Sequence, residues 1–166
     1  MSAKTLIDEY QLLPHPEGGW YKETYRSKAT IISSDLSPEQ SGDRSFSTAI
    51  YFLLEQGNFS AFHRIKSDEC WHFYAGETLM IHMINESGVL TTVRLGSDSR
   101  NGEVYQFVVP ANTWFASIPS TTAIFSFVGC TVSPGFDFID FELAKASNLI
   151  DQFPQHRDLI ISLTRQ

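Results

Sequence analysis

His63 and Glu69 are the two residues of this sequence whose types and spacing best suit acid–base chemistry. They lie within residues 57–76, where two runs of alternating apolar residues flank a polar turn at Ser67-Asp68. Because side chains alternate between the faces of a strand, a hairpin here directs both toward one interior. An imidazole titrates near neutral pH, so it can take a proton from a carbon beside a carbonyl group. We therefore expect His63 and Glu69 to be the catalytic residues, with Glu69 orienting the imidazole.

The same segment resembles the first sequence motif of the cupin superfamily. That motif runs Gly, five residues, His-x-His, three or four residues, Glu, six residues and Gly, and every spacing fits, with Ile65 in place of the second His. A later stretch resembles the second cupin motif, although Asn112 replaces its usual Gly and Phe115 replaces its metal-binding His. Of the four metal ligands that the resemblance implies, His63 and Glu69 are present.

This donor count favours a site without a metal. A catalytic site for a first-row divalent ion generally has at least three protein ligands. His72 lies three residues from Glu69, which in a regular strand turns its side chain to the opposite face unless a bulge intervenes. We therefore expect no cofactor. The alternative is a divalent metal held by His63 and Glu69, with His72, His82 or Glu17 completing the ligands.

Short β-like runs separated by turn signals make up the chain from residue 46 to residue 130. Eight runs at roughly ten-residue spacing are typical of a sandwich, jelly roll or barrel. They cover residues 46–54, 59–65, 70–74, 78–84, 89–95, 104–109, 113–118 and 122–130. A further strand is predicted over residues 20–27, before a polar loop at 31–43. Helical spacing predicts a short helix over residues 5–13 and two more between 138 and 166, broken at Pro154.

Other side chains are candidates for binding the substrate. Alternation along residues 20–27 places Tyr21, Glu23 and Tyr25 on one face. Aromatic rings suit stacking against a sugar or a base, and a guanidinium such as that of Arg26 or Arg44 suits an anionic group. Core packing and surface salt bridges are the alternatives for these residues. The predicted substrate-binding residues are Glu17, Glu23, Tyr25, Arg44, Tyr51, Trp71, Phe73 and Phe115, and Tyr25, Tyr51 and Tyr105 are the candidate proton donors.

Composition narrows the range of partners. The formal charge is −7 and no long basic run is present, so nucleic acid is not an expected partner. No window approaches the roughly 18 apolar residues of a membrane span, and the first ten residues lack the features of a signal peptide. We therefore expect no membrane association and a cytoplasmic location. Cys70 and Cys130 form no Cys-x-x-Cys pair, which favours buried, reduced thiols.

Several further segments together resemble the Cupin_5 family, a group of RmlC-like cupins of largely unassigned function. These are residues 14–20, 23–27, 48–54, 67–76 and 128–138, and the resemblance extends from about Leu6 to Leu163. It implies an all-β fold, a double-stranded β-helix (cupin jelly-roll barrel) with short helices at the N- and C-termini, in one domain over residues 1–166. It also implies a homodimer. In epimerase-type cupins the inward His of the first motif is a general base, and His63 holds that position.

These observations predict a small-molecule-binding protein. We expect metal-independent, isomerase- or epimerase-like proton transfer on a carbohydrate or related carbonyl compound, with a sugar or nucleotide-sugar as ligand. One alternative is a metal-dependent oxygenase or hydrolase. Another is a non-catalytic ligand-binding module, in which His63 and Glu69 only satisfy one another inside the barrel.

Overall fold

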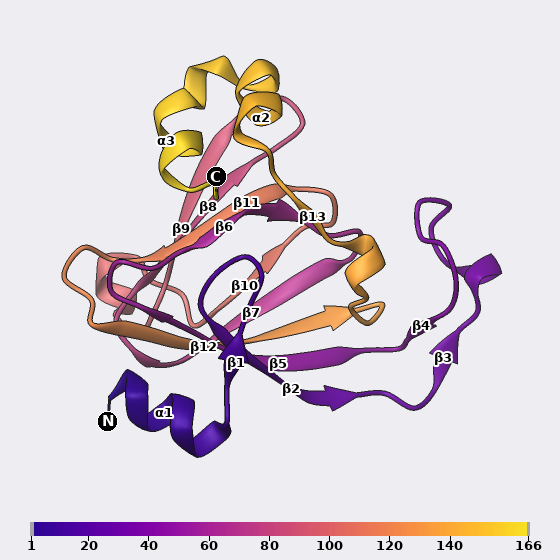
Figure 1. Cartoon of the computed structure of the whole chain (residues 1–166), viewed down its shortest axis with the longest axis horizontal. Helices are drawn as coiled ribbons and strands as arrows, with labels where there is room; N and C mark the ends of the chain where they lie inside the picture. The colour runs from indigo at the N-terminus through magenta and orange to yellow at the C-terminus, as the bar shows by residue number, and fades with distance from the viewer. Residues whose placement is uncertain (1, 166) are drawn as a thin grey trace.

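Two antiparallel β-sheets face each other in the computed structural model, which describes residues 2–165 (Figure 1). Met1 and Gln166, the ends of the predicted 1–166 domain, lie outside the described residues. The six-stranded sheet has the order β1 (Leu13–Pro14), β2 (Trp20–Arg26), β5 (Thr48–Glu55), β12 (Phe125–Ser133), β7 (Asp68–Gly76) and β10 (Gln106–Val109). The five-stranded sheet has the order β13 (Glu142–Leu143), β6 (Ser60–Arg64), β11 (Trp114–Pro119), β8 (Leu79–Ile84) and β9 (Leu90–Leu95).

This arrangement confirms the predicted all-β jelly roll. The eight runs expected between residues 46 and 130 correspond to β5 to β12, with bounds that differ by a few residues. Consecutive strands along the chain often lie in opposite sheets, since β5, β7, β10 and β12 belong to one sheet and β6, β8, β9 and β11 to the other. The sheets form a sandwich of two facing layers, not one continuously hydrogen-bonded barrel.

Strand β5 shows how the sequence encodes these layers. It is apolar on both faces, because Phe52 and Leu54 enter the core between the sheets while Leu53 packs on the outer side. Helix α1 (Ala3–Tyr10) covers that outer side through Leu6, as its place beneath the sheet in Figure 1 shows. A strand buried on both faces reads as a continuous apolar run, as residues 48–54 do.

The C-terminal helices cover the other sheet. Helices α2 (Ala146–Gln152) and α3 (Arg157–Ser162) bury Leu149 and Ile160 against Phe62 of β6. Two helices outside the sandwich, interrupted at Pro154, are therefore confirmed. Within residues 2–165 no helix has the length and apolar character needed to cross a membrane.

Residues 138–145 do not form the predicted α-helix. Phe138–Asp140 is a single 3-10 turn, η3, and Glu142–Leu143 is strand β13, which pairs with β6. Edge pairing with β6 satisfies the backbone of β13, and the aromatic residues of this segment turn toward the interior. Apolar spacing alone does not distinguish that arrangement from a helix.

The polar loop predicted at residues 31–43 belongs to an arm that projects from the sandwich (Figure 1). The arm contains β3 (Thr30–Ile31), a 3-10 turn at Ser33–Asp35 and β4 (Arg44–Ser45). Arg44 at its base is buried, and its Nε and Nη2 atoms donate to the two carboxylate oxygens of Asp140 at 2.7 and 2.8 Å. This pair joins the arm to η3.

Candidate functional site

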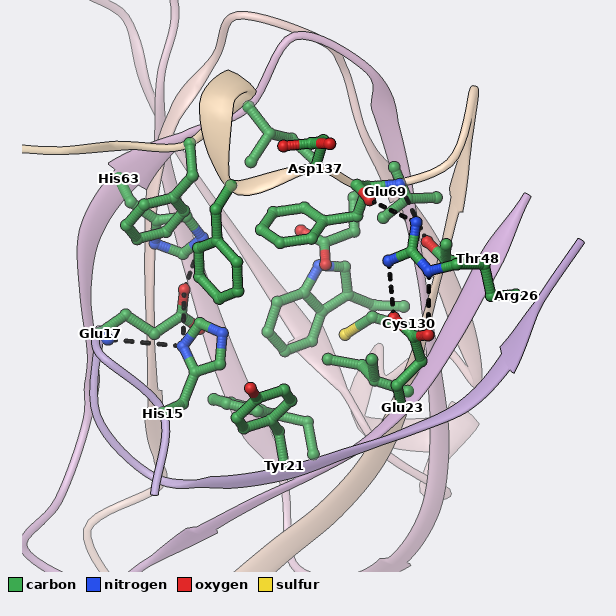
Figure 2. A pocket seen from close by; sticks show the side chains of 18 residues that line it. His15, Glu17, Tyr21, Glu23, Arg26, Thr48, His63, Glu69, Cys130 and Asp137 are labelled. Atoms are coloured by element: carbon green, nitrogen blue, oxygen red, sulfur yellow. Dashed lines mark hydrogen bonds and ion pairs between the residues drawn. The ribbon is translucent and has the colours of Figure 1, made fainter. Parts of the chain in front are cut away.

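A cavity of about 290 Å³ opens between the two sheets, close to the lower end of the volumes typical of small-molecule sites. Figure 2 shows His15, Glu17 and His63 together at one end, and Glu23, Arg26 and Thr48 at the other. Aromatic and aliphatic side chains separate these ends. The full lining is His15, Glu17, Tyr21, Glu23, Arg26, Thr48, Ile50, Phe52, His63, Ile65, Glu69, Trp71, Cys130, Val132, Phe136, Asp137, Phe138 and Phe141.

Glu17 reaches the cavity from a tight turn between β1 and β2. The Gly18 amide donates to the His15 carbonyl, and the Ala61 amide of β6 donates to the Glu17 carbonyl at 2.9 Å. Gly18 has φ +115°, and a Cβ atom there would lie 2.2 Å from the Phe59 carbonyl oxygen. The absence of a side chain at Gly18 therefore lets the turn press against β6.

A β-bulge in β6 brings two partners to Glu17. Along β11, Phe115 pairs with His63 and Ser117 with Ser60, so β6 has one extra residue over this interval. The bulge turns Ser60 and His63 toward the same carboxyl group. The Ser60 hydroxyl donates to Oε1 at 2.9 Å, and His63 Nε2 lies 3.1 Å from Oε2.

The hydrogen bonds of His63 fix where its proton lies. Nδ1 is 2.7 Å from the Ala61 carbonyl oxygen, which can only accept, so Nδ1 carries a hydrogen. Nε2 and Oε2 then need one further proton between them. Burial lowers the pKa of His63 and raises the pKa of Glu17. The neighbouring His15 and the Ser60 hydroxyl partly offset the increase in the pKa of Glu17. A proton held between these two atoms is therefore favoured on Glu17 over His63.

His15 lies beside this pair. Its Nδ1 atom is 3.6 Å from Glu17 Oε2 and accepts the Glu17 amide at 3.4 Å. Burial lowers its pKa, so the ring is neutral near pH 7. His15 was not among the predicted site residues, and its place in the Pro- and Gly-rich segment before β2 was the signal that could have identified it.

Glu69 enters the cavity from β7. Its side chain is buried, and burial raises its pKa to about 7, while His63 acts in the opposite direction. Trp71 and Cys130 face the carboxyl group and also lower its pKa. We expected Glu69 to orient His63. The structure instead places Glu17 against Nε2 and Ala61 against Nδ1, and Glu69 acts on His63 through its charge.

A second bulge sets the other end of the cavity. Along β5, Glu23 pairs with Ile50 and Tyr25 with Ala49, so Thr24 is an extra residue in β2. After Thr24 the side chains of β2 point to the opposite faces from those expected. Tyr25 is 55% exposed outside the cavity, and Arg26 lines the cavity. The predicted common face of Tyr21, Glu23 and Tyr25 is therefore wrong at Tyr25.

Arg26 is paired with Glu23 at this end. Its Nε and Nη2 donate to both oxygens of Glu23 at 2.9 and 2.7 Å, and Nη1 donates to the Phe136 carbonyl at 3.1 Å. Phe136, Phe138 and Phe141 form a cluster of rings with centroids 5.0 to 6.4 Å apart. These three rings close one side of the cavity. None of them was predicted, and Phe138 and Phe141 lie in a segment for which a helix was predicted.

The predicted residues divide into two groups. Glu17, Glu23, His63, Glu69 and Trp71 line the cavity, whereas Tyr25, Arg44, Tyr51, Phe73 and Phe115 do not.

The second group has other contacts. Arg44 binds Asp140, and Tyr51 packs on the outer face of β5 against Tyr10. Phe73 is half-buried and packs against the core cluster, and the ring of Phe115 contacts His63 at a centroid distance of 4.1 Å. Tyr105 is exposed.

The donor set does not fit the metal centre that the motif resemblance implies. Ile65 lines the cavity as an apolar side chain, and the buried Phe115 packs against the His63 ring where a further ligand would stand. His72 bonds Thr131 on the outer face of β7. Across residues 2–165 no three His, Cys, Asp or Glu side chains are arranged to hold a metal ion.

Comparison with known proteins supports the resemblance. The family model Cupin_5, described as cupin superfamily (DUF985), matches residues 4–144. Uncharacterized protein YML079W from Saccharomyces cerevisiae is 30% identical over 156 residues, covering 89% of this chain and 77% of that protein. The structure of protein SO0799 from Shewanella oneidensis is 42% identical, with a TM-score of 0.89 over 99% of this chain and 98% of that one. A hypothetical protein from Leishmania major is 34% identical, with a TM-score of 0.90 over the whole of both chains. The chain therefore belongs to the Cupin_5 family of the cupin superfamily.

Proposed function

We propose that this cupin binds a small carbohydrate or related carbonyl compound in the cavity and moves a proton on it without a metal. The observation that carries the proposal is the buried Glu17–His63 pair, whose Oε2 and Nε2 atoms lie 3.1 Å apart and which lines the cavity. Perturbed titratable groups gathered in a cavity are typical of catalytic sites.

The pair can both take and return a proton. When its shared proton leaves, Nε2 of the neutral His63 is a free acceptor beside the Glu17 carboxylate. A proton taken from a ligand carbon beside a carbonyl group restores the one-proton state, and the same proton can then return to carbon. The pair exchanges this proton with water between turnovers, so a ligand hydrogen is replaced by solvent hydrogen.

Two other groups are placed to assist. Tyr21 is the tyrosine whose side chain lines the cavity, whereas Tyr25, Tyr51 and Tyr105 do not line it. A phenol there can donate to the carbonyl oxygen of the ligand. Glu69 faces the bound molecule from the wall formed by β7.

Solvent exchange tests the proposal. Aldoses, ketoses and sugar nucleotides would be incubated with the protein in D2O, and deuterium entering the ligand would be followed by NMR. His63→Ala should fold, as checked by circular dichroism, and lose exchange by at least about a hundredfold, a typical contribution of a positioned base. Glu17→Gln, which keeps the shape but not the acid, should lose exchange too. Exchange retained in both variants would refute the proposal, and unchanged ligand affinity in His63→Asn without any exchange would indicate a binding module.

A further inference from the structure

Acidic side chains outnumber basic ones around the cavity. Four carboxyl groups line it, from Glu17, Glu23, Glu69 and Asp137, against the single guanidinium of Arg26. All three nitrogens of that guanidinium already donate, to Glu23 and to the Phe136 carbonyl. Burial lowers the pKa of both His15 and His63, which leaves them neutral. The lining thus offers no free positive charge to a phosphate or carboxylate.

Within residues 2–165, Glu69 is the buried carboxyl group of this set that has no ion pair. It is 8% exposed and forms no ion pair with any described residue, whereas Glu23 is bound by Arg26 and Glu17 by His63. A buried carboxylate normally has a cationic partner, because desolvation otherwise costs several kcal/mol. The partner missing from the protein is one that a ligand can supply.

An unpartnered donor marks the same wall. The Trp71 side chain is 1% exposed and lines the cavity, and its Nε1 atom has no hydrogen-bond partner of acceptable geometry among the described residues. A buried N–H without an acceptor is rare in folded proteins. The Trp71 N–H lies close enough to the Glu69 carboxyl group to lower the pKa of that group, and it can also donate to a ligand atom bound beside Glu69.

Aromatic rings make up much of the remaining surface. Those of Tyr21, Phe52, Trp71, Phe136, Phe138 and Phe141 all line the cavity. The face of an aromatic ring attracts a cation, most strongly where water is excluded, and cages of such rings recognise ammonium groups. Carboxylates combined with aromatic faces suit an organic cation and disfavour an anion.

We propose that the ligand carries a positively charged nitrogen, which contacts the Glu69 carboxylate and the aromatic wall, and carries no phosphate or carboxylate group. The idea rests on the proposed function in one respect, since both concern the ligand of this cavity. An amino sugar or a related amino carbonyl compound has both the carbonyl group required by the proposed function and the positively charged nitrogen required here. A nucleotide-sugar does not, because its phosphates would face Glu69, Glu23 and Asp137.

Three probes that differ only in head-group charge test this inference. n-Butylammonium, n-butanol and n-butyrate would each be titrated at pH 7.5 and fixed ionic strength, and the NMR signal of the Trp71 indole N–H, assigned with Trp71→Phe, would report binding. We expect butylammonium to bind at least about tenfold more tightly than butanol, and butyrate to bind most weakly of the three. Glu69→Gln should abolish the tenfold preference. Glu9→Gln, which removes the same charge from an exposed site on α1, should keep the preference.

The contrary results are equally definite. The inference would be overturned if butylammonium and butanol bound equally, if butyrate bound more tightly, or if the preference survived Glu69→Gln. It would also be overturned if no probe gave a response up to about 50 mM, which is well above the roughly millimolar affinity of a weak site. Solvent exchange separates the two proposals. If neutral ketoses exchange through His63 while no cation preference exists, this inference alone fails; if the preference exists without exchange, the proposed function fails.

Discussion

Glu69 is a carboxyl group that burial forces toward its neutral form. Its pKa of about 7 in the folded protein compares with an ordinary value of 4.5. Below pH 4.5 the group is protonated in both the folded and unfolded states, so it imposes no cost. As the pH rises, the unfolded state ionises first, and the folded state loses relative stability until the pH passes 7.

Replacement of Glu69 by Gln should therefore stabilise the protein in a pH-dependent way. The difference in unfolding free energy between Glu69→Gln and the unmodified protein should grow by up to about 3 kcal/mol between pH 4.5 and pH 8, since one pKa unit corresponds to about 1.4 kcal/mol. Urea denaturation at several pH values measures it. Glu9→Gln should show a nearly constant difference, and a constant difference for Glu69→Gln would contradict the shifted pKa.

At this scale the sequence identified the residues but not their pairing. His63 and Glu69 could be selected because the motif spacing places them on one hairpin. The contact of His63 with Glu17 depends on an extra residue in β6. An extra residue in β2 likewise determines that Arg26, and not Tyr25, lines the cavity. A bulge shifts every later side chain to the other face, and nothing in the local residue types of either strand marks where it occurs.

At the scale of elements, the turn between β1 and β2 holds the acid of the site. Gly18→Ala should lower the free energy of unfolding by more than about 1 kcal/mol and weaken the Glu17–His63 contact. The new Cβ atom would collide with the Phe59 carbonyl, and alanine would have to adopt a φ angle that is unfavourable for it. Thermal unfolding and the D2O exchange assay measure both effects. Gly57→Ala is the matched control: φ is +80° but no atom lies within 4 Å. Equal losses in the two variants would show that backbone strain alone is responsible.

Strands were more predictable than the closing segment. The runs that became β5 to β12 are bounded by turn residues, and their alternating or continuous apolar patterns follow directly from two facing sheets. Residues 136–141 do not lie in either sheet, so their sequence need not follow a regular apolar pattern. Phe138 and Phe141 lie on the cavity, and Asp140 binds Arg44, which is 96 positions earlier in the chain. Contacts over that separation decide the conformation, so local spacing could not.

At the scale of the whole molecule, we propose a homodimer. Strand β10 is an edge of its sheet, and it presents an exposed Val108, with Tyr105 exposed just before it. Apolar groups on an unpaired edge favour association. Light scattering should give a mass twice the 18.7 kDa of the chain at micromolar concentration. Val108→Lys should shift the protein toward the single-chain mass, and a single-chain mass for the unmodified protein would contradict the dimer.

The cavity is assembled from parts of the chain that are synthesised at very different times. Its acid comes from residue 17, its imidazole from residue 63, and its aromatic closure from residues 136–141. A nascent chain on the ribosome cannot bind the ligand until about five-sixths of the polypeptide has emerged. The ligand that we propose would therefore act as a late stabiliser of newly made chains.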